Sequence, residues 1–311
     1  MKKVLIFGGS GMIGRHLIRK LTKNNHLVTV VTRNLHQKGA ILKLGGNPGY
    51  IDVIEANIFD ENQLNNLFKN KDVCINLVGI LFEDKKNSFK NIHVNFPNVL
   101  SKKSKEYKLK QFIHISALGI EKALDSDYAI SKLEGEKKII NNFSNFTILR
   151  PSVVFSVDDN FSCRLLNLLN LLPIFPLYYN GNTKFSPIHV TEMCEIISNV
   201  VDKNICSDII QCVGPEELSF KEIIIKLLNS IDKKRLLIPM PIIFANILAF
   251  IFEKLPNPLI TRDQLRLLKY DNILSKNFKS NLDIGFTAKL RFDDEISKYS
   301  YMWKEGGEYS K

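Results

Sequence analysis

The chain has 311 residues, which is enough for one large or two small domains around a sizeable core. Its 43 basic and 32 acidic residues give a net charge of +11, but the lysines are scattered in short runs, so we expect no nucleic-acid partner. The five cysteines form no C-x-x-C pair, which predicts free thiols in a reducing compartment and no metal site. The first apolar run is too short for a signal peptide, and no apolar stretch reaches the roughly 18–20 residues of a spanning helix.

The first motif is a short apolar run from residue 3 to 7 that ends in closely spaced glycines. Gly8, Gly11 and Gly14 have the spacing G-x-x-G-x-x-G, and an amphipathic helical pattern follows them. A strand, a tight turn and a helix N-terminus in this order predict a dinucleotide pyrophosphate site. A glycine-rich turn without a ligand is the alternative. The residues expected at the cofactor are Gly8, Gly9, Ser10, Gly11, Met12, Ile13 and Gly14.

A second strand is predicted from His26 to Thr32, and Arg33 follows it directly. In a nucleotide-binding βαβ unit this position meets the adenosine ribose, where an acid selects NAD and an arginine accommodates the 2′-phosphate of NADP. Arg33 therefore favours NADP(H), with NAD(H) still open. The alternative is an ordinary solvated arginine.

The rest of the first half alternates between strands and helices. Strands are predicted at 51–55, 73–78 and 111–116, and helices within 35–49 and at 61–68 and 91–107. This alternation predicts an α/β protein with a doubly wound parallel sheet. Ligands of such sheets bind at the carboxyl ends of the strands. The residues expected there are Gly8, Arg33, Asn57 and Ile58 near the adenine, Val78, Gly79 and Ser116.

Tyr128 and Lys132 are four residues apart and share one face of a predicted helix. An ammonium beside a phenol lowers its pKa, which would make Tyr128 an acid/base for a carbonyl–alcohol interconversion. Lys132 could also hold the nicotinamide ribose, and Ser116 could bind the substrate oxygen. Chance supplies one such Tyr–Lys spacing in a chain this rich in lysine, so its position after the fifth strand carries the prediction.

After residue 151 the alternation becomes irregular. We predict helices at 161–172, 191–201 and 220–228, strands at 185–190 and 209–213, and an extended apolar loop at 173–177. His189 is interpreted as a structural histidine, with a place in the cleft as the alternative. From Ile242 to Phe252 only Asn246 is polar, and basic residues flank the run. Such a helix is either buried in the core or in contact with a membrane surface or partner.

Several motifs together resemble the extended and atypical short-chain dehydrogenase/reductase superfamily, of the NAD-dependent epimerase/dehydratase type. They are the glycine motif, Ser116, Tyr128 with Lys132, and residues 148–155, which are similar to the sixth strand and the loop over the nicotinamide. Residues 114–119, 258–269, Asp271–Asn272 and the tail 301–308 resemble one branch of it. That branch contains the NAD(P)H-binding accessory subunit of respiratory complex I and bacterial relatives.

The resemblance implies a Rossmann domain at 1–155 and a smaller, mainly helical C-terminal region at 156–311 that completes the cleft. Pro151 would then line the cofactor site, together with Ser116, Tyr128 and Lys132. The cofactor, usually NADPH, would be tightly bound and structural, beside complex I subunits at the inner (cytoplasmic) membrane, with residues 242–252 as the membrane contact. The alternative is an active reductase or epimerase/dehydratase that uses Tyr128 and Lys132. Ser156 and Asn57 depart from the usual glycine and aspartate.

Overall fold

The computed structural model describes residues 1–256 and 258–307 and divides the chain into two compact units. The first unit consists of Met1–Ala117, Ile130–Arg150 and Val190–Gln211, and the second of Leu118–Ala129, Pro151–His189 and Cys212–Lys311. The segments of the two units therefore alternate along the sequence. Glu308, the last residue of the tail motif, lies outside the described residues.

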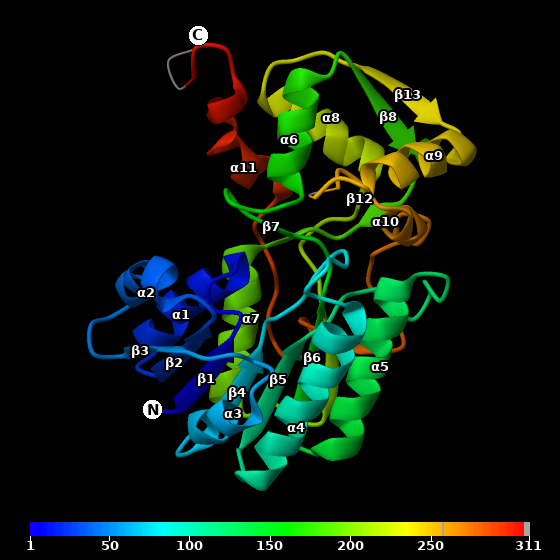
Figure 1. Ribbon diagram of the computed structural model, residues 1–311. Helices are drawn as coiled ribbons and strands as arrows, with labels where there is room; N and C mark the ends of the chain where they lie inside the picture. The colour runs from blue at the N-terminus through cyan, green and yellow to red at the C-terminus, as the bar shows by residue number, and fades with distance from the viewer. Residues whose placement is uncertain (257, 308–311) are drawn as a thin grey trace. The chain divides into compact units, whose positions relative to one another are not determined.

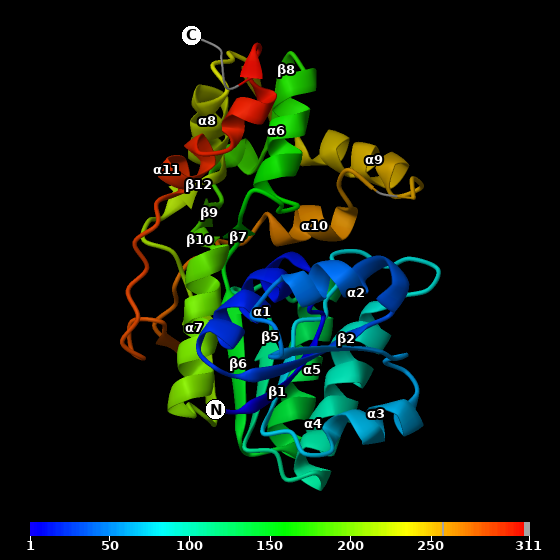
Figure 2. The ribbon, with the colours of Figure 1, turned by 90° about the vertical axis from the view of Figure 1, so that its left-hand side faces the viewer.

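The first unit is a parallel sheet with helices on both faces. The strands lie in the order β11-β6-β5-β4-β1-β2-β3, and the pairs β1–β2, β1–β4, β2–β3, β4–β5 and β5–β6 are parallel. Figures 1 and 2 show α1, α2 and α7 on one face and α3, α4 and α5 on the other. The elements are β1 (Lys3–Phe7), α1 (Met12–Lys23), β2 (Leu27–Thr32), α2 (Leu35–Leu44), β3 (Ile51–Glu55), α3 (Glu61–Phe68), β4 (Val73–Asn76), η1 (Lys90–Asn95), α4 (Phe96–Glu106), β5 (Gln111–Ile115), α5 (Asp127–Asn142), β6 (Phe146–Pro151), α7 (Val190–Lys203) and β11 (Asp208–Cys212).

The core of this unit forms because its strands are apolar on both faces. β1 is buried from Val4 to Phe7, as expected for a central parallel strand covered by helices on both sides. Phe7 packs against Phe68 of α3 and edge-on against Phe96 of α4, with ring centroids 6.3 and 5.4 Å away. The doubly wound α/β fold predicted from the sequence is confirmed.

The second unit has its own apolar core and several short strands. Its elements are β7 (Val154–Phe155), α6 (Ser162–Leu171), β8 (Ile174–Tyr178), η2 (Tyr179–Gly181), β9 (Lys184–Phe185), β10 (Ile188–His189), β12 (Leu218–Ser219), α8 (Phe220–Ser230), β13 (Leu236–Met240), α9 (Ile242–Phe252), α10 (Arg262–Leu267), β14 (Lys279–Ser280), α11 (Phe292–Ser297) and η3 (Ser300–Trp303). Phe155, Leu166, Phe220, Ile223 and Phe292 are among the buried residues of its core.

Three predicted elements differ from the structure. Residues 173–177, expected as an extended loop, form β8, which pairs in parallel with β13. The strand expected at 185–190 is two short strands on either side of Pro187, which has no N–H to donate. The helix expected at 91–107 begins as one turn of π-helix before α4.

Candidate functional site

The loop after β1 is a tight turn that depends on two of its three motif glycines. Gly8 has φ +81°, and a Cβ there would lie 2.9 Å from the Leu77 carbonyl carbon, so the fold itself requires this glycine. A Cβ on Gly14 would lie 2.5 Å from Gly9 Cα, which shows how closely α1 packs on the turn. Gly11 is different, because it is exposed and its Cβ would meet only the Gly8 oxygen, at 3.4 Å. A Cβ at Gly11 would therefore stand at ordinary van der Waals distance, so the fold itself does not require this glycine.

Helix α1 begins directly after the exposed Gly11. Gly11 is its N-cap and makes no side-chain capping bond, and the first turn carries no acidic residue. The first N–H groups of the helix and its positive dipole end are thus available to an anion. Ser10, Met12 and Ile13 occupy the turn around Gly11, as the glycine motif predicts.

Arg33 is exposed immediately after β2, at the position expected for the adenosine ribose. A second cation, Lys38, lies near the glycine loop, because its Nζ is 3.5 Å from Ser10 Oγ. Asn34 caps α2 by accepting from Gln37 N, which fixes the chain directly after Arg33. Lys38 was not among the predicted site residues, because its spacing from Arg33 gives no signal of its own.

Asn57 and Ile58 follow β3, at the carboxyl end of the strand as predicted. Ile58 is buried, whereas Asn57 is exposed. Asn57 Oδ1 accepts from Phe59 N at 3.0 Å, and Asn57 N donates to Gln63 Oε1 at 2.9 Å. The side-chain oxygen of Asn57 is thereby used in holding the turn before α3.

A buried histidine fixes the loop after β4, in which Val78 and Gly79 lie. His93 Nε2 accepts from Ile80 N at 3.2 Å, so its proton is on Nδ1, which lies 2.9 Å from Ser131 Oγ. Burial lowers the pKa of His93 to about 2, with Lys132 as a further cause, and the ring is therefore neutral. Neither His93 nor Ser131 was predicted from the sequence. The π-helical turn places His93 inward, and such turns are common near functional sites.

Ser116 lies directly after β5, where the prediction placed a group for the substrate oxygen. Its Oγ is buried and finds no hydrogen-bond partner among the described residues. Buried hydroxyls in native proteins are usually paired, so an unpartnered one at the end of a central strand is consistent with a ligand atom. His114 Nε2, on the same strand, is also buried without a partner in the described chain.

Lys132 is 4% exposed and its Nζ donates to the Ile115 carbonyl at 3.2 Å. Desolvation lowers the pKa of this ammonium to about 8, although the nearby Glu136 opposes the shift. A Cβ on Gly79 would lie 3.4 Å from Lys132 Nζ, so the absence of a side chain at Gly79 lets the loop after β4 pack closely on the buried ammonium.

Tyr128 lies on α5 one turn before Lys132, as predicted. The sequence predicts that the pKa of Tyr128 is lowered, and this prediction is wrong. Tyr128 is half-buried, and desolvation of its phenol raises the pKa to about 12, so burial outweighs any effect of the lysine ammonium.

Two further sequence candidates belong to the second unit, as Tyr128 does. Pro151 ends β6 and is buried. The ring of His189, on β10, lies 5.2 Å from that of Phe155, edge to face. This aromatic contact agrees with the structural role preferred for His189.

Comparison with known proteins identifies the family. The family model for the NAD dependent epimerase/dehydratase family matches residues 4–210, which is more than half of the chain. The chain belongs to this family. The matched residues include the glycine loop and the polar groups after β4 and β5.

Within the epimerase/dehydratase family, the curated relatives include respiratory-chain subunits. The NADH-ubiquinone oxidoreductase 40 kDa subunit of Neurospora crassa is 24% identical and covers 95% of this chain and 77% of its own length. The alpha subcomplex subunit 9 of NADH dehydrogenase from Mus musculus is 23% identical, with 90% and 75% covered. Both relatives are mitochondrial subunits of NADH:ubiquinone oxidoreductases by name.

Solved structures of similar fold include proteins that hold a sugar nucleotide and NAD. MoeE5 in complex with UDP-glucose and NAD has a TM-score of 0.72 at 15% identity, over 97% of this chain and 98% of that one. UDP-glucuronic acid 4-epimerase from Bacillus cereus has a TM-score of 0.70 at 20% identity, over 96% and 99%. At these identities the comparison establishes the fold alone.

The first unit fits a nicotinamide dinucleotide by its own geometry. The exposed Gly11, the uncapped start of α1 and the unpartnered Ser116 Oγ each match a part of such a ligand. When bound, the nicotinamide supplies or accepts a hydride. The chain would contribute N–H donors at the pyrophosphate, a hydroxyl at Ser116 and an ammonium at Lys132. Among the described residues no group of three His, Cys, Asp or Glu side chains is placed to hold a metal.

Proposed function

We propose that this protein holds NADP(H) as a tightly bound, structural cofactor and acts as an accessory subunit of a respiratory NADH:ubiquinone oxidoreductase, or in quinone metabolism. The observation that carries the proposal is similarity over 95% of the chain to a complex I subunit. A ligand that binds only the native state stabilises it by about 3–4 kcal/mol at 100–1,000 times its Kd. The cofactor would thus support the fold without turnover.

The preference for NADP(H) over NAD(H) rests on two cations. Arg33 directly follows β2, where the sequence pattern predicts the ribose, and Lys38 lies beside Ser10 of the glycine loop. A 2′-phosphate would be neutralised by both, whereas NAD(H) carries no charge at that atom.

The test is to release the nucleotide from purified protein by denaturation, identify it by mass, and measure Kd values for NADPH and NADH. We expect NADP(H), and we expect Arg33→Ala and Lys38→Ala each to raise the Kd of NADPH about tenfold while leaving that of NADH unchanged. The exposed Lys43→Ala on α2 is the control. Recovery of NAD(H) would refute the NADP preference, and absence of any binding would refute the cofactor proposal.

The proposed membrane association rests on α9. Of its eleven residues only Ala245 and Ala249 are buried, so in this chain the helix is not a core helix. Ile243, Phe244 and Ile247 are 70%, 62% and 52% exposed, and Leu236 on β13 is 60% exposed. Figure 1 shows α9 beside β8 and β13. No helix among the described residues is long and apolar enough to cross a bilayer.

The partner proposed for α9 is an anionic lipid surface, which would place the protein at the periphery of the inner (cytoplasmic) membrane. An apolar helix with basic neighbours lies in the interfacial plane and is attracted to anionic headgroups. Lys254 is exposed at its end, and Lys234 precedes β13.

Vesicle flotation tests this. Wild-type protein should float with phosphatidylglycerol-containing vesicles and less with pure phosphatidylcholine, and the difference should shrink at high salt. Phe244→Glu with Ile247→Glu should abolish flotation, whereas Leu44→Glu, at an 84% exposed position of the first unit, should not. Protein that never floats, but co-purifies with complex I through α9, would show that a protein covers this helix.

A second candidate function is an active reductase or epimerase/dehydratase. The unpartnered Ser116 Oγ and the Tyr128–Lys132 spacing on α5 favour it. Tyr128 would be the acid/base, Lys132 its activator and Ser116 the oxyanion partner. Oxidation of bound NADPH by a quinone or sugar ketone, slowed about 10²–10⁴-fold in Tyr128→Phe, would establish turnover and refute a purely structural cofactor.

A further inference from the structure

Residues 261–272 form most of the 258–272 motif that resembles one branch of the family, and the sequence alone gives this motif no physical task. They span α10 and the turn after it, within the second unit. Thr261 and Gln264 form a capping box, so α10 has a well-defined start at Arg262. Leu265 is 1% exposed and anchors the helix against Ala245 and Ala249 of α9. This segment is therefore rigidly held.

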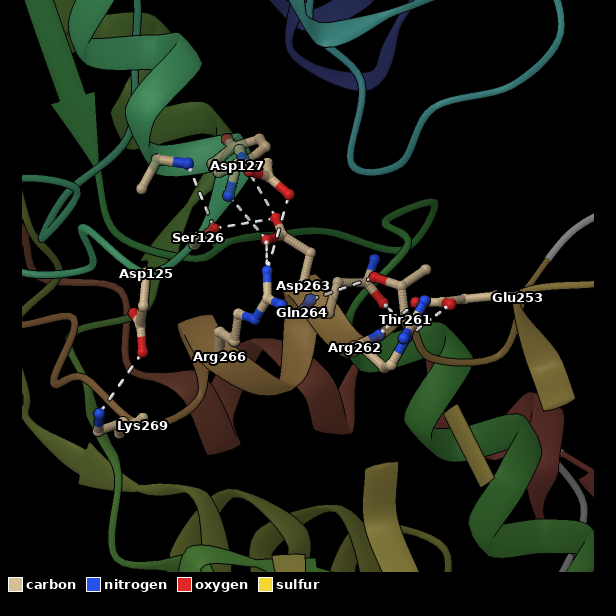
Figure 3. Close-up of polar contacts among 12 residues, drawn as sticks. Asp125, Ser126, Asp127, Glu253, Thr261, Arg262, Asp263, Gln264, Arg266 and Lys269 are labelled. Atoms are coloured by element: carbon tan, nitrogen blue, oxygen red, sulfur yellow. Dashed lines mark hydrogen bonds and ion pairs between the residues drawn. The ribbon is translucent and has the colours of Figure 1, made fainter. Parts of the chain in front are cut away.

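Asp263 of α10 caps the N-terminus of α5, as Figure 3 shows. Its Oδ1 accepts from Asp127 N at 2.8 Å, and its Oδ2 accepts from Tyr128 N at 3.0 Å and from Ser126 Oγ at 2.9 Å. Ser126 Oγ in turn accepts from Ala129 N at 3.3 Å. Three of the four N–H groups that a helix start leaves unsatisfied are thus paired, two of them by a carboxylate that comes from another helix.

The surroundings make this cap strong. The Asp263 side chain is 15% exposed, and its charge lies at the positive end of the α5 dipole. Arg266 Nη1 lies 3.5 Å from Asp263 Oδ1 and 3.7 Å from Asp127 Oδ2, which holds the carboxylate in place. Charge-assisted bonds to backbone N–H groups are stronger than neutral ones.

The same segment holds the chain that leads into α5. Asn272 Nδ2 donates to the Leu118 carbonyl at 2.6 Å. Gly119 has φ +77°, and a Cβ there would lie 3.1 Å from the Asp271 oxygen, so the two chains are in close approach. Between residues 118–119 and the start of α5, Asp125 makes a further contact, because Lys269 Nζ lies 3.5 Å from Asp125 Oδ2. Residues 118–128 are therefore attached at their start, near their end and at the first turn of α5.

We propose that residues 261–272 clamp the 118–128 segment and that Asp263 is the positioning residue for Tyr128. Asp263 acts through the backbone, because two of its three bonds fix the first turn from which the Tyr128 side chain projects. The proposal deepens the proposed function, and only the expected change in NADPH affinity rests on that function. It gives the 258–272 motif a task that neither its composition nor its periodicity indicates.

The chain supplies a matched control. Glu216 is 17% exposed, its Oε1 accepts from Phe292 N at the start of α11 at 2.9 Å, and Arg291 Nη2 lies 3.4 Å from its Oε2. Asp263→Ala and Glu216→Ala each remove a tertiary helix cap with an attached arginine. Only the first should affect α5.

The experiment uses the full chain with 3-fluorotyrosine at position 128 and compares wild type, Asp263→Ala, Asp263→Asn and Glu216→Ala. We expect amide exchange at Asp127 and Tyr128 to be about tenfold faster in Asp263→Ala, with a shifted and broadened ¹⁹F signal. Asp263→Asn keeps one oxygen acceptor, so its amide exchange and its ¹⁹F signal should both lie between those of wild type and Asp263→Ala. Glu216→Ala should change neither. The Kd of NADPH should rise in Asp263→Ala and partly recover in Asp263→Asn.

The possible outcomes distinguish failure of the clamp from failure of the proposed function. Unchanged exchange and ¹⁹F signal in folded Asp263→Ala, or equal changes in Glu216→Ala, would refute the clamp whatever the protein binds. If Asp263→Ala does not fold, Asp263→Asn with wild-type exchange and ¹⁹F signal would refute it as well. Altered exchange and ¹⁹F signal in Asp263→Ala, together with a wild-type chain that binds no nucleotide, would support the clamp and refute the proposed function.

Discussion

Arg150 and Glu136 form a two-bond ion pair in which each side chain is 3% exposed. Arg150 Nε and Nη2 donate to the Glu136 carboxylate at 2.9 and 2.6 Å, which joins the end of β6 to the middle of α5. Glu136 is also one turn after Lys132 and opposes the fall in the pKa of that lysine. The pair therefore fixes α5, the helix that carries Tyr128 and Lys132, and it adds negative charge beside the Lys132 ammonium.

Breaking this pair from one side should be costly. Glu136→Ala leaves a buried guanidinium without its carboxylate, and we expect the free energy of unfolding to fall by about 3–5 kcal/mol. Replacing both residues, as Glu136→Leu with Arg150→Met, should lose much less. Urea denaturation measures both. Equal losses in the single and double variants would show that packing, not the uncompensated charge, determines the effect.

Gly11→Ala separates the ligand from the fold. The position has φ −76°, and a methyl group there would meet only the Gly8 oxygen, at 3.4 Å, so the free energy of unfolding without nucleotide should change by less than about 1 kcal/mol. The methyl group would occupy the place where the pyrophosphate approaches, and the Kd of NADPH should rise at least about tenfold. Thermal denaturation with and without NADPH measures both effects. Full affinity in the Gly11→Ala variant would mean that the glycine motif is only a turn.

The neutral buried His93 predicts a loss of stability in acid. Its pKa is about 2 in the folded chain and near 6.5 when unfolded, so below pH 6.5 only the unfolded chain takes up this proton. The free energy of unfolding should fall by about 1.4 kcal/mol per pH unit from this residue, or about 2 kcal/mol between pH 6.5 and 5. His93→Gln should remove that part of the slope, and His36→Gln, at an exposed position, should not. Denaturation curves recorded across this pH range measure the slope.

Lys132→Met should stabilise the chain without its cofactor and weaken cofactor binding. The pKa of Lys132 is lowered to about 8, so at pH 7 the folded chain keeps a charge that burial disfavours. We expect the free energy of unfolding to rise by about 1–3 kcal/mol at pH 7. This gain should stay constant below pH 8. It should shrink as the pH rises from 8 to 10.5, because the folded wild-type lysine is then already neutral. Lys138→Met, exposed on the same helix, is the control. A destabilised Lys132→Met would show that the Ile115 bond outweighs desolvation.

Local pattern was sufficient for the regular first half. The strand at 51–55 and the helix at 61–68 have the predicted bounds, and the glycine spacing identifies the loop, because strand burial and a sharp turn depend on neighbouring residues. The helix at 242–252 was equally clear, but its periodicity could not distinguish a core helix from an exposed one. Only the packing of Ala245 and Ala249 against α10 decided that.

The sequence by itself determined the fold class, the position of the glycine loop and the pairing of Tyr128 with Lys132 on one helix. It could not determine that Tyr128 is desolvated, that His93 supports the loop after β4, or that Asp263 caps α5 from 135 residues away. The physical reason is that burial and hydrogen bonds between distant segments depend on which chains meet, and no local period encodes that. Asp263 and Asn272 obtain their tasks only when 261–272 lies against 118–128.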